Sequence, residues 1–425
     1  MNSNKPDNLN NRVITLPSLS WATYDFANTI FSMNVVSLYF ALWVVDDLGG
    51  TDLMVAFSRS AAMLFILLTM PLLGALSDRM GNRKSFIFVF TIICCLSTAC
   101  LGFEFDLLTY LIIFGVAVFS FQAALVFYNA LLPDVSPPNK RGKVSGLGVS
   151  LGYLGSLVGM LLVRPFVGVG DAFSRQEAFI PTALLFFLFS LPLFFFVKDK
   201  RTSTITFIPP LWELFKTPYK VFSSSGGFPN VRRFLIGRFF IVDAMETIIA
   251  FMSIYLVMVG RFDQRKVVIA GMDEIMIFLM TATVFAVLGS LVWGMVSDRI
   301  GAGKALKICS LLWVITLLIA VLNPIQPLFW LIGPLAGICL GGVWTSDRAY
   351  LAKIVPDDRR AEFFGLYAVS GRLAAVVGPL IWGITVKLAE PLGDIKYRFA
   401  VLTVFIMMLI GYLLIRKLPE GGEFA

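Results

Sequence analysis

Long apolar segments separated by short polar connections follow one another along nearly the whole chain. Many of these segments reach the roughly 20 residues that an α-helix needs to cross the hydrocarbon core of a bilayer. The pattern therefore predicts an all-α polytopic membrane protein. Its twelve transmembrane helices are expected at residues 19–45, 53–76, 84–103, 107–132, 145–168, 178–197, 233–259, 273–296, 305–322, 328–352, 362–388 and 398–415.

A charged, glycine-containing turn occurs twice in the chain. Its first copy, Gly74–Lys84, ends the second apolar segment, and its second copy, Gly294–Lys304, ends the eighth. The two copies begin 220 residues apart, which is about half of the 425-residue chain. Asp25 and Asp243 repeat at almost the same distance, 218 residues. The repeat predicts two pseudo-symmetric six-helix bundles, an arrangement in which many transporters bind their substrate between the two halves.

One long polar connector interrupts the apolar pattern near the middle of the chain, and its Pro, Ser and Gly residues are typical of a linker. Of the Lys and Arg residues in the connections, 23 lie on the side of this linker and both termini, and seven lie on the opposite side. Such an excess marks the cytoplasmic side of a membrane protein. The expected organisation is a cytoplasmic N-terminal tail at 1–18, a first bundle at 19–197, a cytoplasmic linker at 198–232, a second bundle at 233–415 and a cytoplasmic tail at 416–425.

The composition agrees with membrane insertion. Only 15% of the residues are charged and 58% are hydrophobic, whereas soluble domains carry roughly 25% charged residues. The net charge of +8 follows from the basic connections and requires no nucleic-acid partner. The first eighteen residues are polar and contain no recognisable signal peptide. Together with the compact loops, this favours a multi-pass protein of a bacterial inner membrane over an organellar one.

The residue types present exclude several kinds of chemistry. The chain contains no histidine, so His-based catalysis and a His-metal site are excluded, and its five cysteines lie in apolar segments, which makes a disulfide framework unexpected. No nucleotide-binding loop is recognisable. We therefore expect no enzyme activity, no cofactor and no metal. A carboxylate pair such as Asp243 and Glu246 keeps an intramembrane enzyme open as the poorest alternative.

Polar and charged residues within the predicted spans form the candidate site. An ionisable group at the bilayer centre costs roughly 2.5–3.5 kcal/mol on insertion scales, so such groups mark functional positions. Arg372 lies about ten residues into the eleventh span, and pairing with Asp347 is expected. The alternative is that groups near helix ends are interfacial and form structural ion pairs. The candidates for the substrate and proton pathway are Asp25, Asn28, Gln122, Asn129, Asp243, Glu246, Asp347, Arg348 and Arg372.

Other arginines and the glycines of two spans are assigned to structure. Arg238 is expected to snorkel from a helix end, and Arg59 and Arg164 are expected to be anchors on the extracellular side. Small residues at helical spacing allow helices to pack closely. This role is predicted for Gly146, Gly148, Gly152, Gly155 and Gly159 in the fifth span and for Gly371 and Gly378 in the eleventh.

The two charged turns are candidate gates. An Asp near a helix end can accept backbone N–H groups or pair with a neighbouring Arg, which suits an ionic latch with two states. The alternative is that these charges only set the orientation of the helices in the membrane. The gating candidates are Gly74, Asp78, Arg79, Gly81, Arg83 and Lys84 in the first copy and Gly294, Asp298, Arg299, Gly301 and Lys304 in the second.

Several motifs resemble the major facilitator superfamily and, within it, the vacuole effluxer-like branch named for a fungal autophagy-related amino-acid exporter. The turn Gly74–Lys84 is similar to the superfamily's loop, and Trp21–Asn28, Tyr128–Pro133, Ser145–Gly155, Arg238–Asp243 and Ala361–Tyr367 are similar to motifs of the branch. The resemblance implies that spans one, four, seven and ten line a central cavity, and that the substrates are amino acids. Asp347 departs from the branch, which usually has Ser-Arg-Ser there.

The leading hypothesis is a monomeric secondary active transporter that moves a small polar solute, such as an amino acid, by alternating access. If protons are coupled, Asp25, Asp243 and Glu246 are the carriers, because a carboxyl in apolar surroundings can titrate. The acidic excess on the first and seventh spans also suits a proton-coupled efflux pump for amphipathic cations. A third possibility is a non-transporting membrane sensor on the same fold.

Overall fold

The computed structural model describes residues 15–80, 82–136, 141–168, 172–198, 228–269, 271–323, 325–355 and 360–420. Twelve segments in these ranges are long and apolar enough to cross a membrane, which confirms the predicted fold class. The first span is formed by α1 (Leu16–Phe31), η2 (Ser32–Tyr39), α2 (Phe40–Leu42) and η3 (Trp43–Asp47). The next five are α3 (Asp52–Met80), α4 (Arg83–Cys100), α5 (Leu107–Ala130), α7 (Arg141–Val163) and α8 (Phe179–Phe196). The last six are α10 (Pro229–Met258), α11 (Glu274–Ile300), α12 (Ala302–Leu322), α13 (Phe329–Ile354), α14 (Arg360–Leu388) and α15 (Ile395–Ile415).

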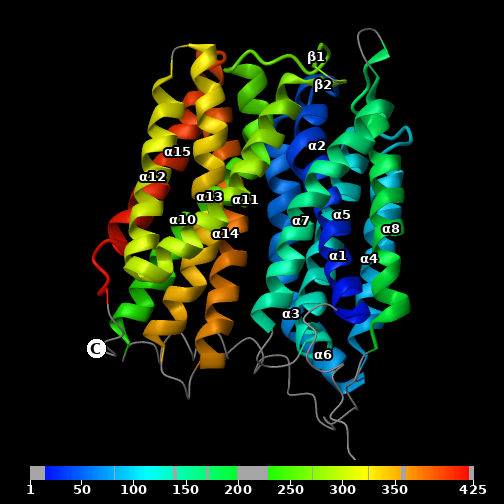
Figure 1. Ribbon diagram of the computed structural model, residues 1–425. Helices are drawn as coiled ribbons and strands as arrows, with labels where there is room; N and C mark the ends of the chain where they lie inside the picture. The colour runs from blue at the N-terminus through cyan, green and yellow to red at the C-terminus, as the bar shows by residue number, and fades with distance from the viewer. Residues whose placement is uncertain are drawn as a thin grey trace, which may run out of the picture.

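The helices form two bundles that stand side by side in Figure 1. The N-terminal bundle contains the first six spans and the C-terminal bundle contains the last six. In the first bundle α1 packs on α7 and α8, and in the second α10 packs on α14 and α15. The equivalent pairs of helices therefore make equivalent contacts, as the sequence repeat predicts.

The two ends of the bundles can be told apart by the elements that lie there. One end, here called the terminal face, carries the start of α1 and the end of α15. The other end, here called the hairpin face, carries an antiparallel two-stranded hairpin of β1 (Val267–Ile269) and β2 (Met272–Asp273). Short 3-10 helices η5 (Arg164–Val167), η7 (Gln176–Ala178), η9 (Gln326–Leu328) and η11 (Glu390–Leu392) also lie in the connections between spans, and a short helix α6 (Leu132–Val135) follows α5.

The predicted domain bounds fall partly outside the described residues. Residues 1–14, 199–227 and 421–425 of the expected tails and linker are among those not described. The second bundle begins at Pro229, four residues inside the expected linker, because Pro suits the first turn of a helix. The first span begins at Leu16, after a capping box in which Thr15 and Ser18 bond each other's backbone N–H groups.

The first span departs from a regular α-helix, which its apolar pattern did not predict. η2 and η3 are π-helical, so their turns are wider than those of α1 and α2. π-Helical turns are uncommon and are often found at functional sites. Here η2 contacts α10 of the second bundle as well as α7 and α8 of the first.

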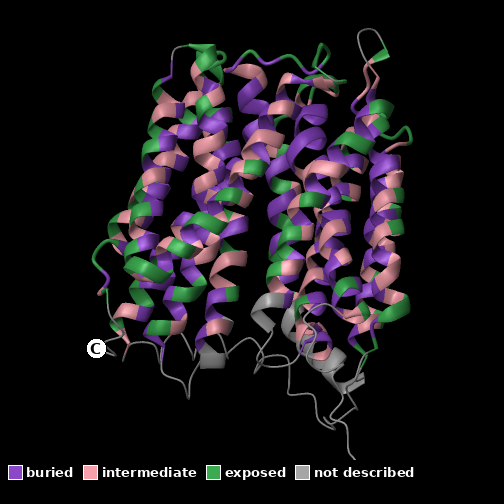
Figure 2. Ribbon diagram, in the orientation of Figure 1, coloured by how far each residue is buried: buried purple, intermediate pink, exposed green. Residues whose placement is uncertain are grey.

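The outer surface of the bundles is apolar, as expected for contact with hydrocarbon. Phe195, Leu184, Leu291 and Phe65 are each more than 60% exposed. Figure 2 shows buried residues on the inner sides of the helices and exposed ones toward the outside. The apolar residues therefore both fill the core and cover the surface that lipid contacts.

Glycines allow α1 and α7 to pack closely. A Cβ atom at Gly148 would lie 2.8 Å from the Trp21 ring, and one at Gly155 would overlap the carbonyl oxygen of Phe26. The predicted packing role is confirmed at these positions. Gly146 was wrongly included, because a Cβ there would meet nothing within 4 Å: this residue lies on a different side of α7 from Gly148 and Gly155.

Candidate functional site

Asp25 and Arg348 face each other from the two bundles. The Asp25 carboxyl on α1 is half-buried, accepts a hydrogen bond from Asn28 at 3.2 Å and lies against Gly148. Arg348 on α13 is exposed, and the two charges are close enough to interact. The structure thus brings together three predicted site residues, Asp25, Asn28 and Arg348.

Tyr128 connects α5 to the same place. Its buried ring stacks on Trp21 at 4.5 Å and on Tyr24 at 5.0 Å, and its hydroxyl is near enough to Asp25 for an electrostatic interaction. The predicted α5 residues Gln122, half-buried, and Asn129, exposed, make no hydrogen bond to another described residue. The residue that α5 contributes near Asp25 is therefore the aromatic Tyr128, which precedes the predicted amide Asn129 in the sequence.

Asp347 is held by an arginine other than the expected one. Its Oδ2 atom lies 3.0 Å from Nε of Arg238 and accepts a hydrogen bond from the Tyr367 hydroxyl at 2.7 Å. The Arg238 guanidinium also lies over the Tyr367 ring, 3.5 Å from its centroid, and donates to Ser370. The expected pairing of Asp347 with Arg372 was wrong, and so was the snorkelling of Arg238, which is buried among α10, α13 and α14.

Arg372 remains without an ion pair among the described residues. It lies on α14, six positions before Gly378, and is half-buried. Arg348 follows Asp347 in the sequence but forms no described ion pair with it. The Oδ2 atom of Asp347 instead accepts hydrogen bonds from Arg238 and Tyr367. Two guanidinium groups of the second bundle are thus not neutralised by a described ion-pair partner.

Asp243 and Glu246 lie one helical turn apart on α10 and have different partners. Asp243 is fully buried, and its Oδ1 atom accepts the Gly378 N–H of α14 at 2.5 Å. Its Oδ2 atom is buried and receives no hydrogen bond from a described residue. Glu246 pairs with Arg59 of α3 in the other bundle at 2.8 Å. Arg59, expected to be an anchor on the extracellular side, is instead a buried ion-pair partner of a predicted site residue.

The other described links between the bundles also lie toward the hairpin face. Arg164 pairs with Asp273 at 3.2 Å, and Asp52 accepts hydrogen bonds from Trp382 and Tyr397 at 3.1 and 3.2 Å. These two acids were not predicted as site residues, because Asp52 is the first residue of a helix and Asp273 is the N-cap of another, positions at which an acid is common. Further links join Ser60 to the Val376 carbonyl at 2.7 Å and Arg175 to Gln264 at 2.7 Å.

Toward the terminal face, no ion pair joins the two bundles within the described residues, and the nearest polar contact between them is that of Tyr153 of α7 with Ser290 of α11, near the middle of the spans. The ribbons of Figure 1 accordingly approach each other near the hairpin and diverge toward the opposite end. The described conformation is therefore one in which the bundles are fastened together on the hairpin face.

Burial changes the acidity of the carboxyl at the start of α11. Asp273 caps this helix, where it accepts the Met276 N–H. Burial raises the pKa of Asp273 to about 6, although the Met276 N–H and the Arg164 charge both act to lower it. The free energy lost when this carboxylate is removed from water therefore exceeds the free energy gained from its hydrogen bond and from the Arg164 charge.

The candidate gating turns are only partly described. Gly74, Asp78 and Arg79 lie in α3, but their side chains and Gly81 are outside the described residues, so the latch remains a prediction there. Arg83 and Lys84 donate to the carbonyls of Ala130 and Val197, at the ends of α5 and after α8. Cations suit helix C-termini, so these two side chains fasten helix ends within the first bundle.

The second candidate gating turn makes no ion pair with the first bundle among the described residues. Gly301 ends α11 with a φ of +89°, which explains the glycine. Gly294 lies within α11, Asp298 and Arg299 are exposed without a described ion pair, and Lys304 pairs with Glu420 at 3.0 Å on the surface. This copy therefore forms no latch with the first bundle among the described residues.

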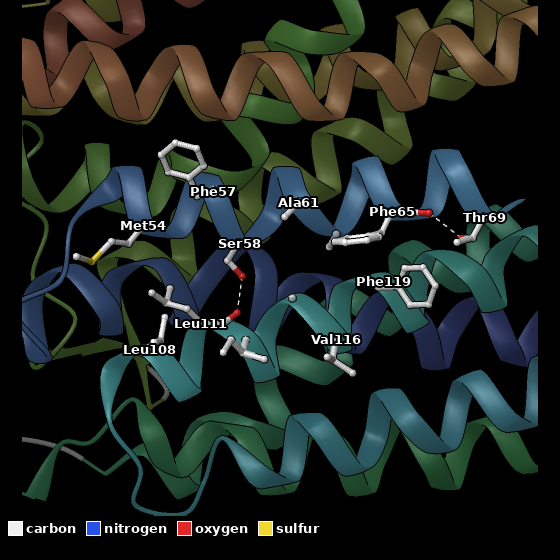
Figure 3. Close-up of a pocket in the computed structure, with 13 residues that line it drawn as sticks. Met54, Phe57, Ser58, Ala61, Phe65, Thr69, Leu108, Leu111, Val116 and Phe119 are labelled. Carbon is white, nitrogen blue, oxygen red and sulfur yellow. Dashed lines mark hydrogen bonds between the residues drawn. The ribbon is translucent and has the colours of Figure 1, made fainter. Parts of the chain in front are cut away.

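The structure contains a cavity near the charged site residues and a larger groove away from them. A cavity of about 190 Å³ lies between the bundles and is lined by side chains that include Thr29, Ser32, Tyr153, Met252 and Thr283. It begins one turn beyond Asp25 along α1. A larger groove of about 650 Å³, between α3 and α5, is lined almost entirely by apolar side chains on the outer surface (Figure 3), so it faces hydrocarbon rather than the site.

The chain is similar to a family of membrane proteins. Residues 50–422 match the family described as "Vacuole effluxer Atg22 like". The chain is 27% identical to the uncharacterized MFS-type transporter YxiO of Bacillus subtilis, with 94% of each chain covered. It is 22% identical to autophagy-related protein 22 of Yarrowia lipolytica, where the match covers 68% of this chain and about half, 52%, of that relative.

Solved structures share the fold. The nucleoside transporter NupG aligns with a TM-score of 0.73 over 95% of this chain and 99% of that chain, at 12% identity. A bacterial homologue of the lysosomal transporter Spinster, in an inward-facing and unoccupied conformation, aligns with a TM-score of 0.70 over 97% and 98%, at 13% identity. Identities this low show a common fold and nothing more.

Proposed function

Because the chain belongs to the vacuole effluxer Atg22-like family of membrane transporters, with a fold of the major facilitator type, we propose that it is a secondary active transporter for a small zwitterionic solute, with amino acids as the substrate class. The two bundles rock about a site between them, which opens in turn to either side of the membrane. Uptake or export is driven by a proton gradient, and the protein works as a monomer in a bacterial inner membrane.

The unequal fastening of the two faces supports alternating access. Ion pairs and hydrogen bonds join the bundles toward the hairpin face, whereas toward the terminal face no ion pair joins them among the described residues. With the termini and the 198–232 linker on the cytoplasmic side, the conformation is inward-facing. When the bundles rotate apart on the hairpin face, the ion pairs between them break. These ion pairs form again only when the bundles rotate back, so they define the closed geometry of this face.

The observation that carries the proposed substrate class is that Asp25 and Arg348 lie on opposite bundles, close enough for their charges to interact. An ammonium group suits the Asp25 carboxylate, and a carboxylate suits the Arg348 guanidinium, which can bind it through two parallel N–H donors. A zwitterion placed between them touches both bundles at once. The cavity beyond Thr29 then leaves room for a side chain.

The same charges weigh against the efflux pump for amphipathic cations. A cation near Asp25 meets the positive charge of Arg348, and Arg372 adds a second guanidinium with no described ion-pair partner. Like charges in a low-dielectric site repel strongly. We therefore do not propose a cationic substrate, but the transport experiment below can detect one.

The test is exchange in proteoliposomes loaded with unlabelled amino acids and supplied with a mixture of tritium-labelled amino acids, without an ion gradient. Wild-type protein is expected to accumulate label by counterflow, and Asp25→Asn and Arg348→Gln are expected to abolish it. Asp263→Asn, at an exposed loop position, serves as the matched control and keeps the wild-type rate. Absence of counterflow for every amino acid contradicts the substrate class, and the same vesicles are then offered a lipophilic cation such as tetraphenylphosphonium.

A further inference from the structure

The two bundles contain equivalent aspartates in equivalent local structure. Asp25 and Asp243 are each followed four residues later by a threonine whose hydroxyl donates back to the aspartate carbonyl. Each threonine also lies against a glycine of the neighbouring helix. The equivalent sets are Asp25, Thr29 and Gly155 on α1 and α7, and Asp243, Thr247 and Gly378 on α10 and α14.

The surroundings of the two carboxyls have nevertheless diverged. Asp25 is half-buried, is bonded by Asn28 and faces the cation Arg348. Asp243 is fully buried, and only one of its two oxygens has a donor, the Gly378 N–H at 2.5 Å. The second oxygen, Oδ2, is buried without a hydrogen bond from any described residue. Asp25 therefore lies opposite a cation of the other bundle, whereas Asp243 is enclosed within its own bundle and has no contact with solvent.

Charge balance at Asp243 favours a neutral carboxyl. Among the described residues, the charged group that acts on it is another acid, Glu246 of the same helix. Arg59 of α3 is engaged by Glu246, Arg238 is engaged by Asp347 of α13, and the contact from α14 is a backbone N–H. An ionised carboxylate buried without a cation or a full set of donors is strongly penalised, whereas the protonated form is not.

A metal cation fits this position poorly. Sodium and other hard cations require several oxygen ligands, whereas the group that approaches Asp243 from α14 is an N–H donor, whose positive end would repel a cation. A proton is the one cation that a single buried oxygen can hold.

Glu246 provides the connection to the hairpin face. Its side chain is 25% exposed and is held by Arg59, which belongs to the other bundle. Separation of the bundles on the hairpin face necessarily removes Arg59 from Glu246. Glu246 then becomes a carboxylate exposed to that compartment, one helical turn from Asp243.

We propose that Asp243 carries the coupled proton and exchanges it with the hairpin-face compartment through Glu246 while Arg59 is withdrawn. Glu246 takes a proton from that compartment; its O–H bond then breaks as an O–H bond forms at Oδ2 of Asp243. Glu246, again ionised, pairs with Arg59 as the hairpin face closes and seals the proton inside. This assignment rests on the proposed function and gives Asp25 to the solute and Asp243 to the proton.

Asp243→Asn tests the division of roles. Asn keeps the shape of the protonated carboxyl and an oxygen for the Gly378 N–H, so the fold is expected to be retained. Counterflow of the tritium-labelled amino acids is expected at the wild-type rate, with loss of accumulation driven by a pH gradient, while Asp25→Asn loses both. Gradient-driven accumulation by Asp243→Asn at the wild-type level overturns the proposal, as does accumulation driven by a sodium gradient in place of a proton gradient.

A second measurement needs no substrate. The infrared C=O stretch of protonated carboxyls, recorded on purified protein at neutral pH, is expected to contain a component in the wild type that is lost in Asp243→Asn and kept in the Asp263→Asn control. A wild-type spectrum that Asp243→Asn leaves unaltered overturns the assignment even if no amino acid is transported. Absence of amino-acid counterflow together with loss of the band in Asp243→Asn contradicts the proposed substrate and supports the proton site.

The route through Glu246 has its own variant. Glu246→Gln is expected to keep counterflow and the infrared band of Asp243 and to lose accumulation driven by a pH gradient. Accumulation by Glu246→Gln at the wild-type level overturns the route.

Discussion

Arg238 and Asp347 form a buried ion pair, with Nε of the arginine 3.0 Å from Oδ2 of the aspartate. The pair joins α10 to α13, and the Tyr367 hydroxyl of α14 donates to the same oxygen. Three helices of the second bundle therefore meet at one carboxylate. Because both charges are removed from solvent, each depends on the other for its stability in the interior.

Removal of the carboxylate is expected to destabilise the second bundle. Asp347→Ala leaves the Arg238 guanidinium buried without a counter-ion, which costs about 3–5 kcal/mol. Chemical denaturation of the purified protein in detergent is the measurement. Replacement of both partners, in the double variant Arg238→Met with Asp347→Leu, is expected to recover most of the lost free energy of unfolding. If Asp347→Ala alone is as stable as the wild type, the role given to this pair is wrong.

The ion pair between Arg59 and Glu246 is expected to bias the protein toward closure of the hairpin face. Arg59→Leu removes the cation from one bundle, so the hairpin face opens more often. A Ser60→Cys reporter placed beside the Val376 carbonyl contact is expected to react faster with a maleimide that cannot cross the membrane. An unchanged labelling rate in Arg59→Leu contradicts a closing role for this pair.

Close packing of α1 on α7 is expected to depend on Gly155. Gly155→Ala places a methyl group on the carbonyl of Phe26, and such overpacking costs about 1–3 kcal/mol. Gly146→Ala is the matched control on the same helix, because its methyl group meets nothing within 4 Å. Thermal unfolding monitored by tryptophan fluorescence compares the two, and equal midpoints would refute the packing assignment.

Closure of the hairpin face is expected to depend on pH through Asp273. In the closed state burial raises the pKa of Asp273 to about 6, above the ordinary value of 3.8. The closed state thus binds this proton more tightly than a solvent-exposed open state, so closure strengthens as the pH falls through about 6 and weakens as it rises. Labelling of Ser60→Cys should slow as the pH falls, after correction for the intrinsic pH dependence of thiol labelling.

The control for this prediction is Asp273→Asn, which imitates the protonated carboxyl and can still cap α11 through its side-chain oxygen. Its corrected labelling rate is expected to be slow and nearly independent of pH around 6. A variant that retains the wild-type pH profile assigns the effect to another group.

The sequence predicted the spans well because the length of each apolar segment is set by the thickness of the bilayer. The duplication was visible in the chain, and it placed Asp25 and Asp243 in equivalent positions. The π-helical turns of Ser32–Tyr39 were not predictable, because their pattern of apolar residues is compatible with an α-helix. The π-helical segment packs against α7, α8 and α10, and these contacts cannot be read from the pattern of one segment.

Partners of charged residues were the least predictable feature. Arg238 was placed near a helix end, but α10 begins at Pro229, a full turn earlier, so Arg238 lies deep enough to reach Asp347. The contact of Arg59 with Glu246 joins residues 187 positions apart in different bundles. Such pairs depend on how bundles are arranged in space, which residue spacing within one helix does not determine.

The rocking of the two bundles can be measured directly by distances between spin labels. One pair of labels spans the bundles at the hairpin face and a second pair spans them at the terminal face, in protein whose five native cysteines have been replaced. Arg59→Leu is expected to lengthen the hairpin-face distance and shorten the terminal-face distance in the same sample. Distances that stay constant, or that change in the same direction at both faces, would contradict alternating access between these bundles.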